Sequence, residues 1–127
     1  MKTLSPFDAV TQFVNAMHQG DLETALSMYE PGASLVAQPG VVVTGTLALR
    51  KALAGFVALK PTMTSEAYQA VEAGDVALYC SRWSLRGTDP AGNPVQMGGR
   101  SSDILRRQPA GNRLIALDNP WGTDIVA

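Results

Sequence analysis

The sequence has 127 residues, 46% of them hydrophobic, with ten Lys and Arg residues against eleven Asp and Glu. This length and hydrophobic content predict one domain, residues 1–127, that can bury its own core. The formal charge of −1 gives no electrostatic footprint for nucleic acid or for an anionic membrane surface, so neither is an expected partner.

The first part of the chain predicts two helices. Ser5 and Pro6 form a helix start, and apolar residues at helical spacing follow until Gly20 ends the helix. Asp21 caps a second, short helix, with Tyr29 at its end. Tyr29 could therefore direct its hydroxyl into the mouth of a pocket, or pack as a half-buried aromatic ring.

The rest of the chain predicts strands around one more helix. Two β-prone runs flank Pro39 and Gly40, which indicates a hairpin over residues 33–45, and a third helix follows until Lys60. Strong turn signals then separate four expected strands: 62–73, 76–87, 95–108 and 113–119. Helices first and strands afterwards predict an α+β domain, with the N-terminal helices packed on a strongly curved antiparallel sheet.

Two carboxylates are expected to meet near the end of this sheet. If residues 109–112 form a four-residue loop, Gln108 faces Arg113. Stepping back along both strands then places Asp103 directly opposite Asp118.

The preceding hairpin predicts a cation beside this pair. If its loop places Thr88 opposite Val95, then Arg82 lies opposite Ser101 and becomes the diagonal neighbour of Asp103. The polar side chains Arg82, Ser101 and Asp103 would then share one face of the sheet.

The face on which Arg82 lies depends on two glycines. Gly98 and Gly99 inside a predicted strand are typical of a β-bulge, which would exchange inward-facing and outward-facing residues. The pairing of Asp103 with Asp118 is independent of such a bulge. Both faces of the predicted sheet are largely apolar, so we expect helices to cover one face and a second copy of the chain, in a homodimer, to cover the other.

The carboxylate pair suggests acid/base chemistry. Two close carboxylates cannot both ionise easily, so the pKa of one rises and a proton donor and a base coexist. We assign Asp118 as the base, Asp103 as the acid or orienting group, and Arg82 as the residue that stabilises the charged form. The alternative is structural: Asp103 and Arg82 belong to a charge ladder on the strand surface, and Asp118 closes a turn.

Three further residues are candidates for ligand binding. Tyr29 would lie at the pocket mouth, Ser101 on the same face as Asp103, and Trp83 could be a stacking platform for a ligand or part of the core. The target would be a small apolar molecule.

Other chemistries lack support in the sequence. One histidine, His18, and one cysteine, Cys80, give no credible zinc site, and no Asp-rich loop resembles a calcium site, so we expect no metal. The sequence contains no Walker motif, no dinucleotide-binding glycine pattern and no Gly-x-Ser-x-Gly motif, so we expect no cofactor. A lone cysteine and the lack of a continuous apolar stretch near residue 1 favour a cytoplasmic location.

The order of elements resembles a known superfamily. The segments that carry the resemblance are HQGDLETALSMYEPGASLV, GTLALRKALAGF and GRSSDILRRQPAGNRLIALDNPWG. They are similar to the nuclear-transport-factor-2-like superfamily, especially its SnoaL-like and ketosteroid-isomerase-like branch. The resemblance implies a cone-shaped fold, usually a homodimer, with a pocket between helices and sheet. It implies no single reaction, because the superfamily includes isomerases, polyketide cyclases, dehydratases and epoxide hydrolases beside non-catalytic domains.

The site residues match none of these enzymes fully. Limonene epoxide hydrolase combines two carboxylates with an Arg two residues before one Asp, a position that is Ser101 here. The SnoaL-like cyclases have a base on the last strand, which resembles Asp118, but their accompanying His has no counterpart. The ketosteroid isomerases pair a base with a protonated acid and a Tyr, for which Asp118, Asp103 and Tyr29 are compatible in type.

Two functions therefore remain open at this stage. The first is a cofactor-independent acid/base enzyme that acts on a small apolar substrate. The second is a non-catalytic module that binds a small hydrophobic molecule or serves dimerisation.

Overall fold

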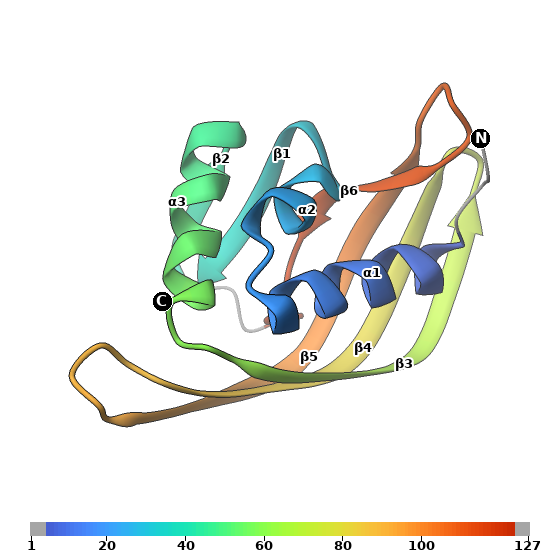
Figure 1. Cartoon of the computed structure of the whole chain (residues 1–127). Coiled ribbons are helices and arrows are strands. Elements are labelled where there is room, and N and C mark those ends of the chain that lie inside the picture. The colour runs from blue at the N-terminus through green and yellow to red at the C-terminus, as the bar shows by residue number, and fades with distance from the viewer. Residues whose placement is uncertain (1–4, 124–127) are drawn as a thin grey trace.

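The computed structural model describes residues 5–123, which form three helices and a six-stranded sheet (Figure 1). The helices are α1 (Pro6–Gln19), α2 (Leu22–Ser27) and α3 (Thr46–Val57). The strands are β1 (Tyr29–Gln38), β2 (Val41–Thr44), β3 (Thr62–Ala73), β4 (Val76–Thr88), β5 (Pro94–Arg107) and β6 (Arg113–Asp118). Within residues 5–123, no helix has the length and apolar character needed to cross a membrane.

The sheet runs in the order β2-β1-β6-β5-β4-β3. The predicted α+β class is confirmed, but the sheet is mixed, because β1 pairs in parallel with β6 while the other neighbours are antiparallel. Figure 1 shows the long strands β3, β4 and β5 bending, with α1 lying across the concave side that they form. The sheet thus presents one face to the helices, and residues 5–123 leave its other face uncovered.

The first helix begins and ends where the sequence predicts. The Ser5 side chain accepts a hydrogen bond of 3.1 Å from the backbone N–H of Asp8, and Gly20 ends α1 in the left-handed conformation with φ 69°. The second helix is shorter than expected, since it ends at Ser27, and Tyr29 is the first residue of β1. This difference matters for the site, because a strand rather than a helix end positions the Tyr29 ring.

The core lies between the helices and the concave face of the sheet. Its buried hydrophobic residues come from every helix and from the central strands: Ala9, Ala16, Met17, Ala25, Leu26, Leu49, Leu53, Tyr79, Leu105 and Ile115. Alternate residues of β4 and β5 face this core, as expected for strands that bury one face.

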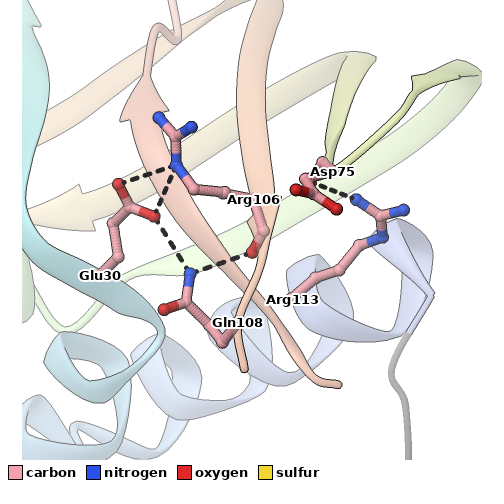
Figure 2. Close-up of polar contacts among 5 residues, drawn as sticks. All are labelled: Glu30, Asp75, Arg106, Gln108 and Arg113. Atoms are coloured by element: carbon pink, nitrogen blue, oxygen red, sulfur yellow. Dashed lines mark hydrogen bonds and ion pairs between the residues drawn. The ribbon is translucent and has the colours of Figure 1, made fainter. Parts of the chain in front are cut away.

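A polar network stabilises the end of the sheet where β5 turns into β6 (Figure 2). The Nε atom of Arg106 donates to the Glu30 carboxylate at 3.1 and 3.3 Å, and Gln108 Nε2 donates to the same carboxylate at 3.0 Å. Arg113 donates from its guanidinium to the backbone carbonyl of Asp75 at 3.3 Å. These contacts connect β1 and the β3–β4 turn to the β5–β6 hairpin.

Candidate functional site

A cavity of about 100 Å³ lies between α1, α3 and the concave face of the sheet. Most of its lining is apolar and includes Phe13, Met17, Leu53 and Phe56 from the helices. The two carboxyl groups of Asp103 and Asp118 also line it, as do the hydroxyl groups of Tyr29, Ser65, Ser81 and Ser101. The site is therefore an apolar cavity with a group of polar side chains on its sheet side.

The two predicted carboxylates do meet. Asp103 lies on β5 and is 8% exposed, and Asp118 is the half-buried last residue of β6. Their side chains share a hydrogen bond. The predicted neighbourhood of Asp103 and Asp118 is confirmed, and both face the cavity rather than open solvent.

The register that brings them together departs from the prediction in two places, and the two departures cancel. Arg113 pairs with Arg107 and not with Gln108, which belongs to the turn. The register then shifts between Ile104 and Leu105, where Ala116 is an extra residue in β6. The second shift restores the alignment of the two carboxyl groups.

Donors surround the pair from both sides. Tyr29 Oη donates to Asp118 Oδ2 at 2.5 Å, and the backbone N–H of Asn119 donates to Asp103 Oδ1 at 2.8 Å. The Ser101 hydroxyl acts on the Asp103 carboxyl as well and lowers its pKa. Asp118 is thus held by the phenol of β1 on one side and by Asp103 on the other.

The environment separates the proton affinities of the two carboxyl groups. Burial raises the pKa of Asp103 well above its ordinary value, and the charge of Asp118 raises it further, against the opposing effect of the Asn119 N–H. Burial also raises the pKa of Asp118, but hydrogen bonds from Tyr29 and Asp103 counter that rise. When the pair holds a single proton, these effects favour Asp103 as the residue that carries it and Asp118 as the ionised partner.

Tyr29 stays a neutral donor in this arrangement. Burial raises its pKa well above 10, and the negative charge of Asp118 acts in the same direction. The ring packs edge-on against Phe13 with centroids 5.7 Å apart, so packing as well as hydrogen bonding orients the hydroxyl.

The predicted place of Arg82 is wrong. Thr88 pairs with Pro94 instead of Val95, because the β4–β5 loop closes one residue earlier than expected, and Arg82 consequently lies opposite Arg100. Arg82 is exposed on the outer face of the sheet, away from Asp103. No cation occupies the position expected for it beside the carboxyl pair, among the residues that line the cavity.

Gly98 and Gly99 do not form a bulge, since the register of β4 and β5 is continuous from Val76–Arg106 to Thr88–Pro94. The small size of Gly98 has another reason. A Cβ atom on Gly98 would lie 2.7 Å from the carbonyl oxygen of Trp83, which is too close for a side chain.

The three residues predicted to bind a ligand, Tyr29, Trp83 and Ser101, all line the cavity. Ligand binding by them stays a prediction. The Trp83 indole donates to the carbonyl of Pro120 at 2.6 Å and packs edge-on against Trp121 at 5.6 Å. The two indoles form one wall of the cavity.

Trp121 lies between the cavity and a second hollow. Its indole donates to the carbonyl of Val36 at 2.9 Å, which fixes the ring over β1. A neighbouring hollow of about 380 Å³ shares Ala37, Phe56 and Trp121 with the cavity. The second hollow therefore adjoins the cavity at Trp121, between α3 and the end of β1.

Sequence reasoning missed Ser81 and the cavity role of Trp121. Ser81 lies between Tyr79 and Trp83 on one face of β4, and this alternation was a usable signal once the register was known. Among residues 5–123, no group of three His, Cys, Asp or Glu side chains is placed to hold a metal ion.

A family model for the SnoaL-like domain matches residues 10–115. Among curated proteins, no sequence matches the chain. Several solved structures share its fold. A ketosteroid isomerase-like protein from Erwinia carotovora atroseptica SCRI1043 has a TM-score of 0.75 and 19% sequence identity, over 87% of both chains.

Two further structures show the same fold. The epoxide hydrolase/cyclase-like enzyme SalBIII, with a role in pyran ring formation in the polyether salinomycin, has a TM-score of 0.72 and 19% identity, over 94% of this chain and 92% of SalBIII. A member of the NTF2-like family from Streptomyces avermitilis has a TM-score of 0.69 and 23% identity, over 87% of this chain and 88% of its own. At this level of identity the structures establish a common fold and not a common reaction.

Proposed function

Because this chain belongs to the SnoaL-like domain family, we propose that its cavity binds a small, mostly apolar molecule and transforms it by acid/base catalysis. The observation that carries this proposal is the hydrogen-bonded pair of Asp103 and Asp118 in an otherwise mainly apolar cavity. Two carboxyl groups whose environments separate their pKa values supply an acid and a base at the same pH.

In the proposed mechanism Asp118 is the base and Asp103 is the acid. A substrate oxygen that replaces Asp118 as the acceptor of the Asp103 proton draws that proton as negative charge develops on it. Asp118 then takes a proton from the substrate, while Tyr29 holds the Asp118 carboxyl in position. The pair still carries one proton in total, which returns to Asp103 through their shared hydrogen bond. Isomerisation, cyclisation and epoxide opening all require such a pair of transfers.

The first test is a titration of the side-chain carboxyl groups by ¹³C NMR. We expect Asp103 to titrate well above an ordinary Asp and above Asp118, because burial and the Asp118 charge oppose its ionisation. Two ordinary values would contradict the acid/base role.

Turnover needs a separate experiment. Small carbonyl compounds, epoxides and cyclic alcohols are screened for an increase in thermal stability, since any ligand of the folded state stabilises it. We expect Asp118→Asn to retain the stabilisation by a hit but to lose conversion of it, whereas Glu66→Gln, at an exposed position on β3, keeps both. Stabilisation without conversion in the wild type would instead identify a non-catalytic binding module.

We also propose that the uncovered face of the sheet contacts a second copy of the chain. Val71, Leu78, Ile104 and Leu117 pair successively across β3, β4, β5 and β6 and form an apolar row on this face. Val71 and Leu78 are 47% and 39% exposed in one chain. Contiguous exposed apolar residues of this kind favour association.

Sedimentation equilibrium tests this assembly. We expect a mass of twice the 13.4 kDa of one chain, and a shift toward the single-chain mass for Leu78→Glu, because the charge would be desolvated in the interface. Leu47→Glu is the control, since Leu47 is 84% exposed on α3. A wild type of single-chain mass, or equal behaviour of both variants, would contradict the proposed interface.

A further inference from the structure

Ser81 and Ser101 form a buried hydroxyl pair in the cavity. They are direct partners on β4 and β5, their Oγ atoms are 2.6 Å apart, and their exposed fractions are 3% and 4%. Both line the cavity, whose lining is otherwise mainly apolar. The acid/base mechanism above uses neither hydroxyl group, so their role is open.

The hydrogen bonds of this pair have a preferred direction. Ser101 lies two residues before Asp103 on the same face of β5, and its side chain acts on the Asp103 carboxyl, whereas the hydrogen-bond partner of Ser81 is Ser101. We therefore infer that the Ser101 hydrogen points toward Asp103, which makes Ser81 the donor of the 2.6 Å bond to Ser101. The chain of donors runs from Ser81 through Ser101 and Asp103 to Asp118.

This direction determines what the open end of the chain can bind. The hydrogen of Ser81 is used in the bond to Ser101, while its oxygen retains lone pairs at the cavity. A buried acceptor is best satisfied by a ligand that brings a donor. A ligand with only an ether or carbonyl oxygen at this position would place two acceptors against each other.

We propose that Ser81 Oγ is a recognition subsite for a hydroxyl group of the substrate, next to the carboxyl pair. The inference rests on the proposed function only for the identity of the reacting groups. The cavity of about 100 Å³ is of the same order as the ~150 Å³ cavity that holds benzene in an engineered protein. The substrate class is accordingly a small, single-ring alcohol whose reacting atom lies beside Asp103 and Asp118.

Three probes of one ring size test this subsite: cyclohexanol, methoxycyclohexane and methylcyclohexane. Their dissociation constants are measured by amide chemical-shift titration. Only cyclohexanol carries a donor, so we expect the wild type to bind it about five to ten times more tightly than methoxycyclohexane, the effect of one hydrogen bond. In Ser81→Ala this preference should fall to about twofold or less.

The chain offers a matched control for this variant. Ser84, also on β4, forms a hydroxyl pair of 2.6 Å with Thr64, but on the outer face of the sheet. Ser84→Ala removes a comparable bond away from the cavity and should leave the preference unchanged. Ser81→Cys, whose thiol is a weak acceptor, gives a second reading if Ser81→Ala does not fold.

Several results would contradict the proposed role of Ser81. These are equal binding of cyclohexanol and methoxycyclohexane by the wild type, no binding of any probe, or an unchanged preference in Ser81→Ala. A preference that disappears in Asp118→Asn but not in Ser81→Ala would assign donor recognition to the carboxylate instead. Failure of the proposed function is separate, because it shows as two ordinary carboxyl pKa values in the ligand-free protein whether or not cyclohexanol is preferred.

Discussion

Replacing Asp103 with asparagine should keep the protein at least as stable as the wild type at neutral pH and yet reduce turnover about 10²–10⁴-fold, the usual contribution of a general acid. The amide reproduces the neutral form of the carboxyl group. Its oxygen can accept from the Asn119 N–H, and its NH₂ group can donate to Asp118. It has no proton to transfer.

The pH dependence of stability shows why Asp103→Asn should not destabilise the protein at neutral pH. The pKa of Asp103 is raised in the folded state above the ordinary 3.8. At pH values between the ordinary pKa and the raised pKa of the folded state, the unfolded chain binds fewer protons than the folded one. The free energy of unfolding of the wild type therefore falls as the pH rises through this range. Below the ordinary Asp pKa, Asp103 is protonated in both the folded and the unfolded state, so the two states bind equal numbers of protons there.

Urea unfolding of both proteins at a series of pH values measures this difference. The free energy of unfolding of Asp103→Asn relative to the wild type should increase with pH across this pH range. Asp103→Ala is the control, since it removes the hydrogen bonds as well as the charge and should be less stable than Asp103→Asn at every pH. An Asn variant that is less stable than the wild type at neutral pH would mean that Asp103 is ionised in the folded protein.

Arg113→Ala should lower the free energy of unfolding by about 3 kcal/mol, the usual size for removing a large, fully buried side chain and its hydrogen bonds. Arg113 is 1% exposed and donates to the Asp75 carbonyl at 3.3 Å and to Glu72 Oε1 at 2.6 Å. Truncation leaves a cavity where the buried side chain was, while the Asp75 carbonyl keeps the Arg107 backbone N–H as a donor at 2.7 Å. The loss of the ion pair with Glu72 contributes little to this change, because the Glu72 side chain is 58% exposed.

Arg107 provides the matched control. It pairs directly with Arg113 in the sheet but is exposed, so Arg107→Ala makes the same change of charge and of side chain. We expect an effect within about 0.5 kcal/mol for this surface position. Equal midpoints of urea unfolding for the two variants would show that the buried contacts of Arg113 contribute nothing to stability.

The sequence predicted the strands well because their boundaries are local. Gly74, residues 89–94 and residues 109–112 are turn signals that any folded context would use, and the strands end within a residue or two of them. The parallel pairing of β1 with β6 could not be predicted in this way, because no turn connects the two strands.

The site was predictable in part. Asp103 and Asp118 do lie together, although the prediction took the β5–β6 turn to be one residue too short and missed an extra residue, Ala116, that no sequence signal indicated. The same one-residue uncertainty in the preceding hairpin moved Arg82 to the wrong face. Because side chains alternate along a strand, a register error of one residue leaves the fold intact and changes the site completely.

The bond from Tyr29 to Asp118 joins two residues that are 89 positions apart in the chain. Contacts of such long sequence separation are expected to form slowly, because the loop between them must lose its freedom before the contact stabilises anything. The hairpins of β3, β4 and β5 can assemble early, whereas the phenol and the carboxylate come together only when β6 enters between β1 and β5. The bond between Tyr29 and Asp118 is therefore expected to be among the last contacts of the site to form during refolding.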